Sequence, residues 1–69
     1  MGFIEIYVNG QAHQVPESCS VARLLDELEL SGQRIATELN REILPRSRYS
    51  QHALHPGDRI EIVRAIGGG

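Results

Sequence analysis

The chain has 69 residues, of which 41% are hydrophobic and 23% charged, with a formal net charge of −2. A chain of this length forms one domain that buries only about 60% of the surface its unfolded form exposes, which leaves no room for an enclosed substrate cavity. The balanced charge argues against a nucleic-acid or anionic-membrane partner, and no apolar stretch is long enough to span a bilayer. The single cysteine, Cys19, excludes an internal disulfide and suits a reducing cytosol, so a cytoplasmic location is expected.

The chain begins with a predicted β-hairpin. Residues 3–8 alternate, with the even-numbered apolar residues on one face. Asn9-Gly10 follows directly and favours a two-residue hairpin turn, because both residues tolerate positive φ. Residues 11–15 are the returning strand, and Pro16 after them suits the edge of a sheet.

A short amphipathic helix follows. Four apolar residues have the spacing i, i+3, i+4 and i+7 that forms one stripe along a helix, namely Val21, Leu24, Leu25 and Leu28. Ser20 is the predicted N-cap, and Ser31-Gly32 is the predicted stop signal, which gives a helix of about nine or ten residues. A helix this short is unstable alone in water, so it must pack on a sheet.

Further strands are predicted in the second half of the chain. Residues 34–40 alternate, with Ile35, Thr37 and Leu39 on one face. A turn at residues 40–41 leads to a short strand over residues 42–44.

Residues 46–52 are predicted to form a loop with one helical turn. His55-Pro-Gly-Asp58 has the composition of a type II turn. It leads into a final strand over residues 59–65 with Ile60 and Ile62 inward.

This order of elements predicts an α+β fold in which one mixed sheet of four to five strands packs on one main helix, over residues 1–65. A helical crossover places the last strand parallel to the first, near the centre of the sheet. The far face of the sheet is left open, and we expect it to dock a partner. It carries Phe3, Tyr7, Glu61 and Val63.

The sequence contains no catalytic or metal-binding constellation. His52 and His55 are three residues apart, but His13 is distant and no cluster supplies the three or four ligands that a metal site needs. Cys19 precedes the helix, where the helix dipole can lower a thiol pKa. No histidine is spaced as its partner base, so Cys19 is predicted to be a small loop or core residue. Arg46, Arg48, Arg59 and Arg64 are matched by nearby acids and lack interleaved aromatic residues, which indicates solvated surface.

The chain ends in a predicted flexible glycine tail, Ile66-Gly67-Gly68-Gly69. Glycine has no Cβ, so such a tail fits a channel too narrow for side chains. The terminal carboxyl of Gly69 is ionised at pH 7, since its unperturbed pKa is about 3.3–3.7. After adenylation by a partner it becomes open to attack by a thiol, sulfide or amine. The alternatives are a disordered terminus or leftover linker on a plain interaction module.

The chain resembles the ThiS family of bacterial sulfur carrier proteins of thiamin biosynthesis over essentially its whole length. The resemblance rests on Val8-Asn-Gly10, Ser20-Val-Ala-Arg-Leu-Leu25, Glu38-Leu-Asn-Arg-Glu-Ile-Leu-Pro-Arg46, and the segment from Gly57 to the terminal glycines. It implies a ubiquitin-like β-grasp fold. Many relatives end in two glycines, so Gly67 is a departure from the family pattern.

The resemblance also implies a mechanism in which the chain is not an enzyme and binds no cofactor. An E1-like ThiF partner, using ATP and magnesium, adenylates Gly69, with Gly68 as its companion. A cysteine desulfurase or related donor supplies sulfur to give a thiocarboxylate, and the thiazole synthase ThiG takes the sulfur. Two related functions stay open, namely a carrier like the small subunit of molybdopterin synthase and a ubiquitin-like modifier that forms isopeptide bonds.

Overall fold

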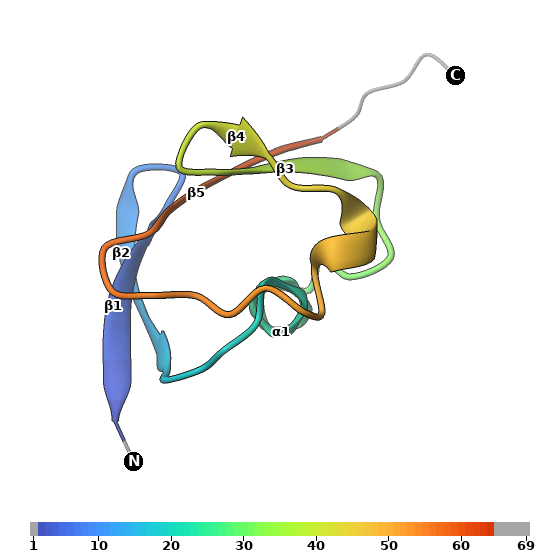
Figure 1. Cartoon of the computed structure of the whole chain (residues 1–69). Coiled ribbons are helices and arrows are strands. Elements are labelled where there is room, and N and C mark those ends of the chain that lie inside the picture. Colours follow the sequence, from blue (N-terminus) through green and yellow to red (C-terminus); the bar gives the residue numbers. More distant parts are fainter. Residues whose placement is uncertain (1, 65–69) are drawn as a thin grey trace.

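A computed structural model describes residues 2–64, in which one five-stranded sheet packs against one α-helix (Figure 1). The strands are β1 (Phe3–Val8), β2 (Gln11–Pro16), β3 (Ile35–Leu39), β4 (Glu42–Ile43) and β5 (Arg59–Arg64). The helices are α1 (Val21–Glu27) and a 3-10 turn, η1 (Arg46–Arg48). The predicted α+β class, the single mixed sheet and the helical turn after β4 are confirmed.

The strand order is β2-β1-β5-β3-β4, with β5 in the centre. β1 and β5 are parallel, with Tyr7 opposite Arg59, and the other neighbouring strands are antiparallel. The predicted parallel placement of the last strand beside the first is therefore confirmed. Because the two strands run the same way, the start of β1 and the end of β5 lie at opposite ends of the sheet.

The hairpin turn between β1 and β2 forms as predicted. Asn9 and Gly10 have φ values of 50° and 84°, the left-handed region that a two-residue hairpin turn requires. The Asn9 side chain has a second role, because its Oδ1 accepts a hydrogen bond from the backbone N–H of Ile62 at 2.8 Å. The turn is thereby fastened to β5, a contact across 53 residues that the local pattern did not indicate.

Helix α1 begins as predicted and ends earlier than predicted. The Ser20 hydroxyl accepts a hydrogen bond from the N–H of Arg23 at 3.1 Å, which is an N-cap. The helix ends at Glu27, so the predicted stop at Ser31-Gly32 was wrong.

The reason is a left-handed residue two positions after the last helical one. Glu29 has a φ of 60°. Its N–H donates to the carbonyl of Asp26 at 3.0 Å, and the N–H of Leu30 donates to the carbonyl of Leu25 at 2.8 Å. These two bonds form a Schellman motif, whose left-handed position is usually glycine. Glutamate in this position gave no stop signal in the sequence.

We therefore expect Glu29→Gly to stabilise the protein by about 0.5–1 kcal/mol, because it removes the strain of a side chain at positive φ. Glu27→Gly is the matched control, and it is expected to destabilise the protein by a similar amount because Glu27 is helical. Urea unfolding of both variants measures the difference. Destabilisation by both substitutions would contradict the assignment of Glu29 to the left-handed position.

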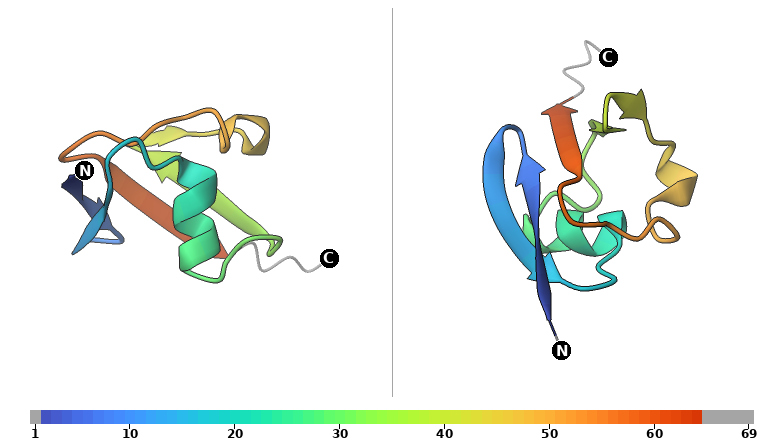
Figure 2. Two further views of the ribbon diagram at one scale, coloured as in Figure 1. Left: turned by 90° about the horizontal axis from the view of Figure 1, so that it is seen from below. Right: turned by 60° about the vertical axis from the view of Figure 1, so that its left-hand side comes forward.

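The core lies between α1 and the inner face of the sheet (Figure 2). Six side chains are less than 2% exposed, namely Ile6, Leu24, Ile60, Val15, Val21 and Thr37. Thr37 confirms the predicted inward face of β3, but its hydroxyl has no hydrogen-bond partner among the described residues. The buried part of the inner face is thus apolar apart from one hydroxyl, and burying an unpaired hydroxyl lowers stability.

Candidate functional site

The predicted reactive tail follows β5 in the chain. Arg64 is the last described residue, and Ile35 at the start of β3 is its cross-strand partner. The predicted functional tail, Ile66, Gly67, Gly68 and Gly69, lies outside the described residues, as does Ala65. Within residues 2–64, the candidate site is therefore the surface around this end of the sheet.

The predicted docking residues share the outer face of the sheet but do not form one apolar patch. Phe3 and Val63 are 68% and 57% exposed, and they stand at opposite ends because β1 and β5 are parallel. Between them, the Arg59 guanidinium carbon lies 5.4 Å from the centre of the Tyr7 ring, a cation–π contact. The register places Phe3, Tyr7, Glu61 and Val63 on the predicted outer face. That this face docks a partner stays a prediction.

Three apolar residues lie on the outer face of β5, β3 and β4. Val63 is opposite Ala36 on β3, and Ile43 on β4 is opposite Glu38, two residues along β3. Ile43 is 68% exposed. We call Ala36, Ile43 and Val63 the outer patch. Ala36 and Ile43 were missed from the sequence, because their proximity to Val63 depends on the pairing of three strands.

Two carboxylates adjoin the outer patch. Glu38 and Glu61 are direct cross-strand partners on β3 and β5. Like charges placed opposite each other destabilise a sheet. The outer patch therefore combines exposed apolar side chains with a local negative charge.

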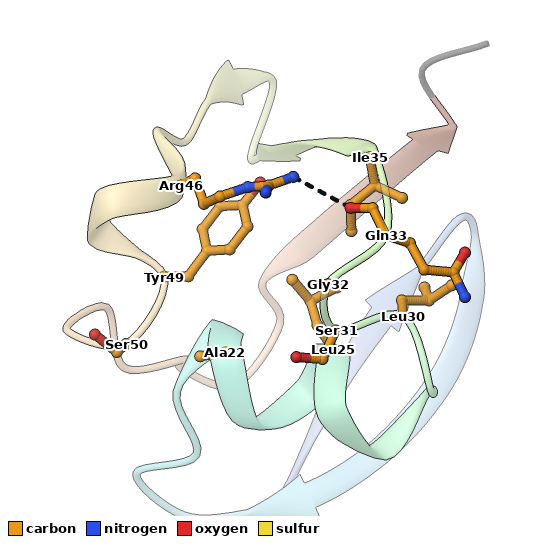
Figure 3. A pocket seen from close by; sticks show the side chains of 10 residues that line it. All are labelled: Ala22, Leu25, Leu30, Ser31, Gly32, Gln33, Ile35, Arg46, Tyr49 and Ser50. Atoms are coloured by element: carbon orange, nitrogen blue, oxygen red, sulfur yellow. Dashed lines mark hydrogen bonds between the residues drawn. The ribbon is translucent and has the colours of Figure 1, made fainter. Parts of the chain in front are cut away.

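A hollow of about 240 Å³ lies on the other side of the sheet (Figure 3). It separates α1 and the following turn from the segment that contains η1. Arg46 reaches across its opening, where Nη2 donates a hydrogen bond to the carbonyl of Gln33 at 3.1 Å. The residues that line it are Ala22, Leu25, Leu30, Ser31, Gly32, Gln33, Ile35, Arg46, Tyr49 and Ser50. We call this feature the helix-side hollow.

Cys19 is confirmed as a core residue. It is 5% exposed. Burial, with the negative charge of Glu27 adding to it, raises the pKa of the Cys19 thiol, although Arg23 acts in the opposite direction. The thiolate form is therefore disfavoured, contrary to what proximity to a helix N-terminus suggested.

No three metal-ligating side chains come together in residues 2–64. The backbone carbonyl of His52 accepts a hydrogen bond from the N–H of Val21 at 3.0 Å, which joins its loop to the start of α1. His13 and His52 are half-buried, and His55 is exposed. The three histidines are therefore not brought together with other ligands into a metal site within residues 2–64.

Four arginines are exposed, as predicted, but form no ion pair with an acid within residues 2–64, namely Arg46, Arg48, Arg59 and Arg64. Within the described part of the chain, the one ion pair joins Arg23 to Glu27, with 3.7 Å between Nε and Oε2. Arg46 and Arg59 contact a carbonyl and an aromatic ring instead. Among residues 2–64, no helix is long and apolar enough to cross a membrane.

Comparison with known proteins identifies the family. The profile of the ThiS family matches residues 3–69. The chain belongs to the ThiS family. This ThiS-family chain is 33% identical over 66 residues to the sulfur carrier protein ThiS of Escherichia coli, covering 96% of this chain and 100% of that protein.

A solved structure supports the fold. A crystal structure of the thiamine biosynthesis protein ThiS from Geobacter metallireducens superimposes with a TM-score of 0.83 at 32% identity. The superposition covers 96% of this ThiS-family chain and 100% of that one. The β-grasp architecture expected from the resemblance is confirmed.

One relative is much longer. A thiazole synthase of Paramagnetospirillum magneticum is 41% identical over 66 residues. The match covers 96% of this ThiS-family chain but only 20% of the length of that synthase. A segment like this chain therefore occurs within a protein of that name.

Proposed function

We propose that the protein is a sulfur carrier of thiamin biosynthesis in which the carboxylate of Gly69 carries the sulfur. The observation that carries the proposal is a family match that extends to residue 69 and so includes the glycine end. The Escherichia coli relative bears the name sulfur carrier protein, and the match spans all of it.

The chemistry proceeds in two steps on partner enzymes. A Gly69 carboxylate oxygen attacks the α-phosphate of ATP, which forms an acyl-adenylate and releases pyrophosphate. The sulfur of a donor then attacks the acyl carbon and displaces AMP. Hydrosulfide gives the thiocarboxylate directly, whereas a persulfide donor gives an acyl disulfide that a thiol reduces to the thiocarboxylate. An E1-like adenylating partner supplies the ATP and magnesium site, so the chain itself is a substrate and binds no cofactor.

The composition of the chain suits an activated carboxyl group. All seven of its basic residues are arginines, so none of the 69 residues offers a lysine amine to capture the acyl-adenylate. The one thiol, Cys19, is buried, and its pKa is raised by that burial. The chain therefore has no lysine, and no exposed thiol among its cysteines, that would compete with the sulfur donor.

The outer patch is proposed to contact the adenylating partner beside the tail. Val63 near the end of β5 and Ile43 opposite Glu38 are large apolar residues exposed on this part of the outer face. A partner surface that pairs apolar side chains with a basic residue complements them and the neighbouring Glu38 and Glu61. Phe3, at the far end of the outer face, and Tyr7, which is covered by the Arg59 contact, are proposed to contribute less to this contact.

The acceptor of the sulfur is proposed to be a thiazole synthase. Two relatives that bear this name contain a segment like the present chain, at 41% and 32% identity. Joining a donor domain to its acceptor raises the effective concentration of one at the other. The separate chain is proposed to make the same contact by association.

The mass of the intact protein tests the carrier function. After incubation with ATP, magnesium, the E1-like partner and the sulfur donor, we expect a gain equal to the difference between one sulfur atom and one oxygen atom. The same mixture without ATP is the control and should show no gain. No mass change with competent partners would contradict the proposal, and covalent attachment to lysines of other proteins would indicate a protein modifier instead.

A further inference from the structure

The helix-side hollow has an apolar interior that is built by distant segments. The N–H of Ala22 on α1 donates to the carbonyl of Tyr49 at 2.9 Å, which fixes the η1 segment against the helix. Leu25 and Ile35 line the hollow and are themselves buried. The walls are therefore held by core packing and backbone hydrogen bonds, and the hollow is formed before any partner binds.

One arginine, Arg46, stands at the rim of the hollow. Arg46 uses one nitrogen for the Gln33 carbonyl, and a guanidinium has five N–H donors in all. The wall of residues 43–57 that carries Arg46 contains no aspartate or glutamate. Arg46 forms no ion pair within residues 2–64. A carboxylate on a ligand would meet available donors here.

The size of the hollow indicates what fills it. Pockets that bind small molecules typically have volumes of about 300–1,000 Å³, and this one has about 240 Å³. Protein interfaces commonly place one large apolar side chain in a pocket of the partner, and arginine is enriched at such positions. An apolar anchor residue flanked by a carboxylate fits both the volume and the charge.

The hollow lies beside the place where the tail begins. Ile35, which lines it, is the direct cross-strand partner of Arg64. A protein that receives the residues after Arg64 must lie over this end of the sheet. It can therefore reach the hollow without a second docking event.

We propose that the helix-side hollow is the docking pocket for a large apolar side chain, flanked by a carboxylate, on the thiazole synthase that accepts the sulfur. This inference rests on the proposed function, because it assumes that the tail enters that partner. It assigns the two sides of the sheet to different partners, with the outer patch facing the adenylating enzyme. Arg46 then has two roles, since it holds the Gln33 turn and meets the partner's carboxylate.

Two variants of the full chain test the pocket. Arg46→Glu reverses the charge at the rim, and Ala22→Leu fills the hollow with a residue of good helix propensity. Arg48→Glu makes the same charge change on an η1 residue that does not line the hollow, and Ala53→Leu enlarges an exposed alanine elsewhere. Affinity for the thiazole synthase of the same organism is measured by calorimetry at about 0.15 M salt, where charges more than about 8 Å apart are largely screened.

We expect each hollow variant to raise the dissociation constant at least about tenfold, while each control changes it by less than about threefold. Thermal melts show whether a variant is folded, and Ala22→Leu keeps the test valid if Arg46→Glu destabilises the Gln33 turn. Unchanged affinity in a folded hollow variant, equal losses in variants and controls, or no binding by the unaltered chain would overturn the proposal. Failure of the carrier function would be seen separately, as no mass gain in the unaltered chain.

Discussion

A chain that ends at Gly68 is expected to accept sulfur at least about 100-fold more slowly than one that ends at Gly69. Removing one residue moves the carboxylate by about 3.3–3.6 Å along an extended chain, and a misplacement of only 1 Å in an active site can cost about 100-fold in rate. One alanine added after Gly69 should have the same effect, because the carboxylate then lies one residue too far. The initial rate of thiocarboxylate formation, read from intact mass, measures both.

Both length variants should keep the stability of the parent chain. The buried core residues lie between Ile6 and Ile60, well before the altered end. Thermal melts that coincide with the parent are therefore expected. An unfolded Gly68-terminated chain, or one that still loads sulfur at the parent rate, would contradict the division between a folded handle and a reactive end.

Leu24→Ala is expected to destabilise the protein by about 2–5 kcal/mol, the range for a large-to-small change in a core. Leu24 is 1% exposed, and its side chain belongs to the cluster that joins α1 to the sheet. The total stability of a small domain is about 5–15 kcal/mol, so the loss is a large fraction. Urea unfolding measures it, and the melting temperature should fall by roughly 10 °C or more.

Phe3→Ala provides the comparison. Phe3 is larger than leucine but 68% exposed, so its removal should change stability by less than about 0.5 kcal/mol. A smaller effect for Leu24→Ala than for Phe3→Ala would show that the apolar stripe of α1 does not carry the core. The pair therefore tests burial rather than hydrophobicity.

The hairpin, the helix start and the inward residues of β3 were predictable because each depends on neighbours in the chain. Alternation selects Ile35, Thr37 and Leu39, and Asn9-Gly10 selects its own turn. The helix end was not predictable in the same way. Glu29 takes a left-handed conformation because two backbone hydrogen bonds and the packing of Leu30 favour it, against the intrinsic preference of glutamate.

The candidate docking surfaces were also not predictable from local patterns. Sequence pattern placed Phe3, Tyr7, Glu61 and Val63 on one face, but strand direction and register separate Phe3 from Val63. They place Ala36 directly opposite Val63, with Ile43 on the next strand opposite Glu38. The helix-side hollow joins Ala22, Gln33 and Arg46 from three separate segments, and no local spacing indicates that contact.

The sequence by itself determined the class of fold, because short-range periodicity marks each strand and the helix without knowledge of distant contacts. It also predicted that the terminal glycines are the reactive end, which stays a prediction. Only the tertiary structure decided which apolar residues form the outer patch and that an arginine spans a hollow beside the end of β5. Both depend on contacts between residues far apart in the chain, whose geometry is fixed by strand pairing and core packing together.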